Sequence, residues 1–176
     1  MMADHTSLVV RTMRAGESDA VRDVTLAAYE EYAAIMPAQF WTGYRRHLLA
    51  TLDAKRAVDR IVAERQGVIV GSVLLFPPAA NAYAGAAGGS EWPEVRLLAV
   101  LPSARGQGVG IALMAECVQR ARHAGAAALG LHTMDVMRAA VRMYERMGFA
   151  RMPNLDFSPA QGVLVKGYRL DLRDAA

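Results

Sequence analysis

Three glycines at alternate positions, Gly106, Gly108 and Gly110, separate an apolar run from a helix-like run in residues 96 to 122. The N-terminus of a helix exposes backbone N–H groups that lack partners inside the helix, and it carries partial positive charge. Glycines just before such a helix permit positive φ, so that several N–H groups can converge on one phosphate or pyrophosphate. The segment is a candidate anion site with Arg105 as an added cation. A tight strand-to-helix turn packed closely on a sheet would need the same glycines.

Two phosphate-binding motifs fail on spacing. A P-loop needs a lysine and a hydroxyl residue after its last glycine, and Gly110 is followed by neither. A dinucleotide fingerprint started at Gly106 meets Ile111 at its last position, and one started at Gly108 meets Leu113. A nucleotide-binding protein of either kind is therefore disfavoured.

The stretch RGQGVG, residues 105 to 110, matches the pattern Arg/Gln-x-x-Gly-x-Gly/Ala. It resembles the acetyl-CoA-binding motif of the GCN5-related N-acetyltransferase (GNAT) family. EVRLLAVLPSARGQGVGIALM is similar to the central strand, loop and helix of that family, and AAVRMYERMGFAR is similar to its later helix and following strand. The resemblance covers most of the chain from Leu8 to Leu172, with specific motifs between Glu94 and Phe149.

The resemblance implies how acetyl-CoA is held. Backbone groups of a splayed strand would pair with the pantetheine arm as though it were an extra strand, and the backbone N–H groups of the glycine segment would hold the pyrophosphate. The residues expected at the cofactor are Leu98, Val100, Arg105, Gly106, Gln107, Gly108, Val109, Gly110 and Ile111. A strand edge followed by an anion site fits the shape of an acyl-CoA.

Acetyl transfer from a thioester to an amine needs a neutral amine, a stabilised oxyanion and preferably a proton for the departing thiolate, with no metal and no covalent intermediate. Tyr144 in RMYERMGF matches the tyrosine that many family members use as general acid, and a phenol of pKa about 10 is protonated at neutral pH. The alternative is a tyrosine that fills the apolar side of a helix. An asparagine is frequent seven residues earlier in the family, where this chain has Met137.

Glu94 begins the strand EVRLLAV, where some family members carry a glutamate that deprotonates the amine directly or through water. The alternative is a solvated carboxylate at the end of a strand. Cys117 lies mid-helix among apolar residues and is expected in the core. His123 and His132 end elements without a partner at ligand spacing, so we expect both to be structural.

The stretch YEEY, residues 29 to 32, lies with Trp41, Tyr44 and His47 in the region where the resemblance places the acceptor. Glu30 and Glu31 could attract an amine, although adjacent acids on a helix are more often a solvated face. The acceptor class stays open between a small-molecule amine and a peptide amine.

The elements that must position these residues alternate between strands and helices. A two-residue turn at Gln66 and Gly67 is expected to join two strands as a hairpin, and Gly125 and Gly148 are expected to end helices. The expected strands are 8–13, 60–65, 67–76, 94–101, 127–133 and 163–172, and the expected helices begin near Ser18 and span 38–54, 108–123 and 136–147. This order predicts an α/β domain, and the resemblance implies a mixed, mostly antiparallel central sheet flanked by helices. We expect one GNAT-like domain over 1–176.

The 176 residues have a formal net charge of +3, and 53% of them are hydrophobic. The basic residues are scattered, which disfavours a nucleic-acid partner. No window approaches the roughly 18 apolar residues of a membrane span, and the N-terminus lacks the pattern of a secretory signal. No cysteine and histidine spacing resembles a zinc site. We therefore expect a cytoplasmic protein without a metal, and family habit favours a homodimer.

Together these features predict an acetyl-CoA-dependent N-acetyltransferase in which an acceptor amine attacks directly. The alternative is a non-catalytic acyl-CoA sensor or regulatory module, because a fold and a cofactor site do not by themselves establish turnover.

Overall fold

The computed structural model describes residues 7–55, 58–78 and 90–173. Most of the small-residue loop expected between the second hairpin strand and the central strand, residues 79–89, lies outside them. The chain divides into two compact units, one of Met1–Leu74 with Leu97–Glu116 and one of Leu75–Arg96 with Cys117–Ala176. The prediction of a single domain stays a prediction.

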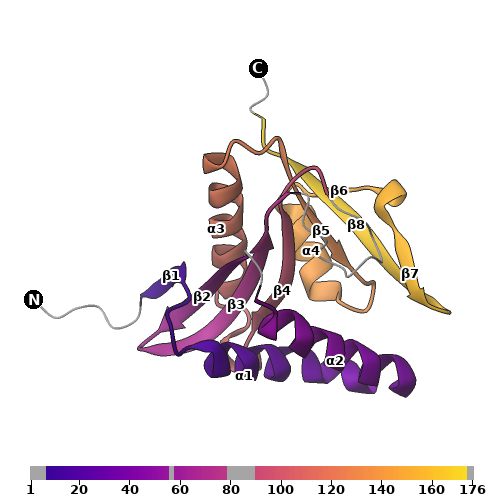
Figure 1. Cartoon of the computed structure of the whole chain (residues 1–176), viewed down its shortest axis with the longest axis horizontal. Helices are drawn as coiled ribbons and strands as arrows, with labels where there is room; N and C mark the ends of the chain where they lie inside the picture. Colours follow the sequence, from indigo (N-terminus) through magenta and orange to yellow (C-terminus); the bar gives the residue numbers. More distant parts are fainter. Residues whose placement is uncertain (1–6, 56–57, 79–89, 174–176) are drawn as a thin grey trace, which may run out of the picture. The chain divides into compact units, whose positions relative to one another are not determined.

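The first unit carries the strand order β1-β2-β3-β4, and Figure 1 shows β1, β2 and β3 as neighbouring arrows. Gln66 (φ +53°) and Gly67 (φ +77°) form the turn between β2 and β3, and two left-handed residues suit the twist of a hairpin, so the predicted two-residue turn is confirmed. The elements that lie wholly or partly in this unit are β1 Leu8–Thr12, α1 Ser18–Tyr29, η1 Glu30–Ala34, α2 Ala38–Asp53, β2 Asp59–Arg65, β3 Val68–Phe76, β4 Glu94–Val100, η2 Pro102–Ala104 and α3 Val109–His123.

Helix α1 packs on the core of this unit through one apolar stripe. Its buried residues, Val21, Val24, Thr25, Ala28 and Tyr29, recur at three- and four-residue spacing, which places them on one face of an α-helix. The helix begins at Ser18, as the sequence predicts. After α1 the chain tightens to a 3₁₀ helix from Glu30 to Ala34.

The start of α3 is fixed on β3 by a glycine. A Cβ on Gly71 would lie 2.8 Å from Val109 Cγ1 and 3.0 Å from Leu113 Cδ1. Val109 is 1% exposed and Leu113 is 0% exposed, so both side chains are pressed into the space that Gly71 leaves. The first turn of α3 can therefore approach the strand only because residue 71 has no side chain.

The second unit carries the order β4-β5-β8-β6, with β7 paired to β8. Glu94 pairs with Gly130 and Val95 with Leu131 in a parallel arrangement, and β5 runs antiparallel to β8 from Ala128↔Asp171 to Thr133↔Lys166. Figure 1 shows β5 beside the long strand β8. The further elements of this unit are β5 Ala128–Thr133, α4 Arg138–Arg146, β6 Ala150–Arg151, η3 Pro153–Leu155, β7 Phe157–Ala160 and β8 Val163–Asp171.

Left-handed glycines end both helices as predicted, Gly125 at φ +74° after α3 and Gly148 at φ +91° after α4. The order of elements predicted along the chain omits β6 and β7, although the resemblance implies a strand at the position of β6. Both are short, at two and four residues, and a length of that kind leaves no alternation to detect. Among the described residues, no helix is both long and apolar enough to cross a membrane.

An ion-pair network ties β1 to β2 and to the start of α1. Arg11 donates to both carboxylate oxygens of Glu17, at 2.8 and 2.7 Å, and also to Glu64. The backbone N–H of Arg14 donates to Glu17 Oε2 at 2.7 Å. The Arg11 guanidinium and this backbone donor lower the pKa of Glu17 from 4.5 to about 2, since both favour the ionised carboxylate.

Replacing Gly71 by alanine is expected to lower the free energy of unfolding by about 1–3 kcal/mol, because the added methyl overlaps Val109 and Leu113. Gly43→Ala is the matched control. Gly43 lies in α2, and beyond its chain neighbours and the backbone of its own helix no heavy atom of the described residues lies within 4 Å of a Cβ placed on it, so alanine there should be neutral or stabilising. Urea unfolding of the three proteins measures the difference, and equal stability of both variants would contradict the close packing at Gly71.

Glu17→Gln is expected to destabilise the protein near neutral pH and to matter less as the pH falls. The lowered pKa of Glu17 means that its contribution is present above about pH 4.5 and is lost as the pH approaches 2. Urea unfolding at pH 7 and at pH 3 measures the two stability differences. Glu145→Gln in α4 is the control, and a stability loss for Glu17→Gln that stays constant over this range would contradict the network.

Candidate active site

The glycine segment forms an open backbone loop in the first unit, between η2 and α3. Gly106 and Gly108 have φ of +71° and +79°, and beyond its chain neighbours no heavy atom of the described residues lies within 4 Å of a Cβ built on either one. The N–H of Ala112 makes a 3.0 Å bond to the carbonyl of Gly108 at the start of α3. The N–H groups of Val109, Gly110 and Ile111 therefore precede the ladder of helix bonds, and they are available to an anion.

The two long side chains of this loop are engaged with neighbours in the first unit. Arg105 donates to Glu31 Oε2 at 2.8 Å and to the carbonyl of Ala28 at 3.0 Å. Gln107 donates to the carbonyl of Ser103 at 3.1 Å and also accepts from Arg65. The sequence predicts Arg105 as an added cation over the anion site, whereas its guanidinium is bound to the end of α1 and to η1. The backbone, more than these side chains, is left for a ligand.

Strand β4 departs from regular geometry at Leu97, which has φ +53°. A left-handed residue inside a strand turns the following backbone out of the regular ladder. The carbonyl of Leu98, expected at the pantetheine arm, accepts a 3.1 Å hydrogen bond from the hydroxyl of Tyr29. Val100 ends the strand, half-buried. The sequence does not connect Tyr29 with this strand, because nothing in the chain order links a helix residue to a carbonyl 69 residues later.

The expected acceptor region is an aromatic cluster on α1, η1 and α2. The ring of Tyr44 lies 6.3 Å from Tyr29, 5.6 Å from Phe40 and 6.2 Å from Trp41, and Tyr32 lies 5.8 Å from Tyr29. Burial raises the pKa of the Tyr32 phenol, and the nearby Glu31 raises it further. The Glu31 carboxylate is already paired with the guanidinium of Arg105 from the glycine segment.

Tyr144 lies in the second unit on α4, with 6% of its surface exposed. Its ring is 5.9 Å from that of Phe149 at an interplanar angle of 60°. The side chain therefore has the burial of a core tyrosine, and its role as general acid stays a prediction. Met137, at the position where the family often has asparagine, accepts a hydrogen bond from the Thr133 hydroxyl at 3.6 Å through its sulfur.

Glu94 is buried, with only 4% of the residue exposed, so the alternative of a solvated carboxylate at a strand end is wrong. Its Oε2 lies 3.5 Å from Nδ1 of His132, and both side chains are about equally buried, at 6% and 5% exposure. His132, expected to be a structural residue, thus has a partner in Glu94. The partner comes from the register of the parallel strands β4 and β5, which the spacing of residues along the chain does not reveal.

The remaining reactive side chains take structural positions. Cys117 is 0% exposed, as expected for a core cysteine, and His123 is exposed in the last turn of α3. Over the residues that the structure describes, no group of three or more histidine, cysteine, aspartate or glutamate side chains could hold a metal ion. The absence of a metal from the reaction stays a prediction.

The model of the acetyltransferase (GNAT) family matches residues 24–149, which is more than half of the chain. The chain belongs to this family. The resemblance inferred from RGQGVG and MYERMGF is thus confirmed, and the family is one of acetyltransferases, as the sequence predicted. The matched region includes both α3 with its glycine loop and α4 with Tyr144.

A curated relative agrees with the assignment of this chain to the GNAT family. An uncharacterized N-acetyltransferase of Schizosaccharomyces pombe is 29% identical over 89 residues, which are 51% of this chain and 49% of that relative. The matched part of the chain thus spans about half the length of this curated relative.

Two solved structures share the fold of this GNAT chain. A GNAT family acetyltransferase from Brucella melitensis, crystallised with acetyl-CoA, is 24% identical with a TM-score of 0.63, and the match covers 95% of this chain and 89% of that one. The ribosomal-protein-S18-alanine N-acetyltransferase of Escherichia coli is 16% identical with a TM-score of 0.67, and the match covers 97% of each chain. These likenesses confirm the predicted fold class, a mixed and mostly antiparallel sheet flanked by helices.

Proposed function

We propose that this chain is an N-acetyltransferase that transfers the acetyl group of acetyl-CoA directly to the amine of an acceptor. The observation that carries the proposal is the pair of left-handed glycines, Gly106 and Gly108, that open directly into the N-terminus of α3. Family membership and the acetyl-CoA complex of the Brucella melitensis relative support the choice of donor.

The residues present fit an acyl-CoA. The space around Gly106 and Gly108 is open, and the N–H groups from Gly106 to Ile111 follow one another around the loop into the helix. The N–H of Arg105 donates to the carbonyl of Pro102 at 3.4 Å. A pyrophosphate bound there would be held by backbone dipoles and by the helix N-terminus. The arm would run along β4, where Leu98 and Val100 offer backbone groups beyond the left-handed residue Leu97.

The chain's own residues would manage the protons of the transfer, and the bound thioester supplies the activated acetyl group. Glu94 takes a proton from the acceptor ammonium, directly or through water, so that the nitrogen can form the new C–N bond. As the C–S bond breaks, the hydroxyl of Tyr144 gives its proton to the sulfur, and the second proton lost by nitrogen restores the phenol. The products are an amide, a free thiol and one proton.

The acceptor in this proposal is an amine of a small molecule or of a peptide. The Escherichia coli relative acts on a protein by its name, which keeps peptide amines among the candidates. The aromatic cluster around Tyr44 would then contact the acceptor, as the resemblance implies for this region. The cytoplasmic location and the homodimer stay predictions.

One observation favours a second function, a non-catalytic acyl-CoA sensor. Tyr144 and Glu94, the two side chains expected to do chemistry, are 6% and 4% exposed, which is also the burial of purely structural groups. Release of free thiol from acetyl-CoA across a panel of amines separates the two functions, because a sensor binds acetyl-CoA without releasing thiol.

Gly108→Val is expected to weaken acetyl-CoA binding about ten-fold or more, because the side chain would project among the N–H groups of the loop. Gly16→Val is the matched control, since Gly16 also has a positive φ, of +88°, with open space around it, but lies in the turn before α1. Both variants should lose about 1–2 kcal/mol of stability from backbone strain. Calorimetric titration measures the affinity, and an unchanged Kd in Gly108→Val would count against the pyrophosphate site.

Tyr144→Phe is expected to lower kcat by about 10²-fold with the Kd for acetyl-CoA largely unchanged, because the variant loses only the proton donated to sulfur. Glu94→Gln should lower kcat similarly, since the amide cannot take a proton from the amine. Tyr168→Phe, another buried tyrosine of the second unit, is the control and should keep its turnover. Thiol release in the presence of an accepted amine is the measurement, and wild-type kcat in Tyr144→Phe would remove its role as the acid.

A further inference from the structure

A row of paired residues crosses β4, β5 and β8 in the second unit. Glu94 pairs with Gly130, and Gly130 pairs with Arg169, so the three lie side by side on the same face. A Cβ on Gly130 would lie 2.5 Å from Glu94 Oε1 and 2.6 Å from Trp92 Nε1. The missing side chain of Gly130 therefore makes room for the Glu94 carboxylate, and Arg169 lies over the Trp92 ring at 4.8 Å.

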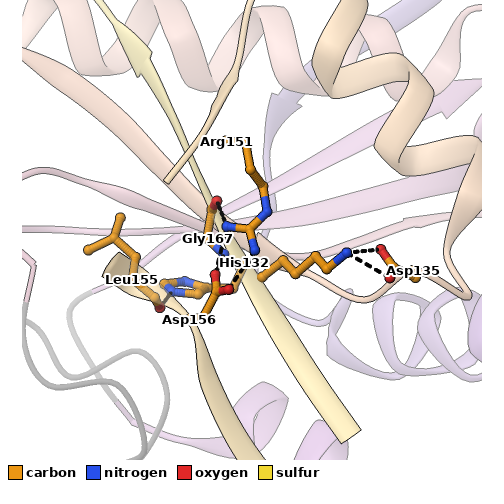
Figure 2. A network of polar contacts seen from close by, with 7 residues as sticks. His132, Asp135, Arg151, Leu155, Asp156 and Gly167 are labelled. Atoms are coloured by element: carbon orange, nitrogen blue, oxygen red, sulfur yellow. Dashed lines mark hydrogen bonds and ion pairs between the residues drawn. The ribbon is translucent and has the colours of Figure 1, made fainter. Parts of the chain in front are cut away.

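A second glycine makes room beside His132. His132 pairs with Gly167 of β8, and a Cβ on Gly167 would overlap the Cβ of Leu155. Leu155, the last residue of η3, thus rests on the strand at the position opposite the histidine. Its carbonyl oxygen lies 2.9 Å from Nε2 of His132, as Figure 2 shows.

This contact fixes which ring nitrogen of His132 carries the proton. A backbone carbonyl only accepts hydrogen bonds, so Nε2 must hold a hydrogen and donate it to Leu155. Nδ1 is then the nitrogen that gains or loses a proton, and it is the atom that faces Glu94 Oε2 at 3.5 Å. Catalytic contacts of this length are common before substrate binds and tighten in the complex.

The segment that carries Leu155 is held firmly. Arg151 binds both carboxylate oxygens of Asp156, one of them at 2.7 Å, and Asp156 Oδ1 accepts the backbone N–H of Gly167 at 3.0 Å. Figure 2 shows these contacts around the strand that carries Gly167. The ring of Phe157, 5.4 Å from that of His132, adds a further contact. The orientation of the imidazole is thus set by η3 and β7 as well as by its own strand.

We propose that His132 is a positioning residue for Glu94. Nδ1 of His132 receives the proton that Glu94 takes from the acceptor amine. The inference rests on the proposed acetyl transfer and adds a residue to it. A carboxylate at 4% exposure is costly to keep charged without a partner, and the imidazole supplies one that can hold a positive charge.

The proton step balances within the pair. The N–H bond of the ammonium breaks as an O–H bond forms on Glu94, and the proton then passes from that oxygen to Nδ1. The pair changes from carboxylate and neutral imidazole to carboxylate and imidazolium, so Glu94 faces the reaction as an anion again. The proton leaves through the same carboxylate after the product departs.

Other charged side chains lie on the elements packed against His132, but the structure pairs two of them elsewhere. These groups are Glu94 on β4, Lys166 and Arg169 on β8 and Asp156 after η3. Lys166 binds Asp135 at 2.7 Å, and the Arg151 guanidinium beside Asp156 lowers the pKa of that carboxyl. Among the charged contacts that the structure records, Glu94 is the carboxylate that meets the imidazole.

Two substitutions separate the two ring nitrogens of His132. His132→Gln can still donate to the Leu155 carbonyl but has no group at Nδ1, whereas His132→Asn places an amide near Nδ1 that cannot accept a proton. We expect both to lower kcat at least about ten-fold while the KM and Kd for acetyl-CoA stay near wild type. His123→Gln, on the exposed end of α3, is the control and should leave kcat unchanged.

The pH profile of kcat/KM is the readout that a structural role would not move. Both variants remove the imidazole as the proton acceptor of the pair, so the acid limb of the profile is expected to move relative to the wild type, at a lower plateau.

Wild-type kcat in either variant would overturn the proposal, as would a lower kcat with the acid limb unmoved. Absence of thiol release from the wild type would instead overturn the proposed acetyl transfer itself.

Discussion

The burial of one carboxylate organises the second unit. Glu94 sits at the start of a parallel strand, where its backbone pairs with Gly130 and its side chain is closed off from water. His132 on the next strand brings its Nδ1 to 3.5 Å from Oε2 of this carboxylate. Nε2 of His132 is hydrogen-bonded to the Leu155 carbonyl. The segment that carries Leu155 is held by the ion pair between Arg151 and Asp156. A single buried carboxylate is thus connected to several short elements by one series of contacts.

The sequence was most informative where chemistry and backbone geometry coincide. The glycines of RGQGVG predicted both the end of a strand and the start of α3, because left-handed backbone and an exposed helix N-terminus both favour glycine. The turn at Gln66 and Gly67 and the glycine caps after α3 and α4 were predictable for the same reason. Helical spacing is also present in the buried face of α1, where Val21, Val24 and Ala28 recur at three- and four-residue intervals.

The sequence was least informative where side chains from distant segments meet. The contact of His132 with Glu94 depends on the register of two parallel strands, and parallel register is set by packing rather than by a turn. Arg105 and Glu31 pair across 74 residues of sequence. The sequence therefore predicted the Arg105 cation at a ligand, whereas the structure pairs it with Glu31 of η1. The segment that orients His132, η3 with β7, is short and carries no periodic pattern.

The glycines of this chain constrain evolutionary substitution in two different ways. For folding, Gly106 and Gly108 are constrained only by the handedness of their backbone in open space, so asparagine could replace either one alone at modest cost in stability. Gly130 and Gly167 are constrained by volume, because Trp92, Glu94 and Leu155 already occupy the space of a side chain. Change at the first pair can proceed one residue at a time. A substitution at Gly130 or Gly167 must follow a substitution of the side chain that fills its space. The order in which substitutions occur therefore limits evolutionary change at these two positions.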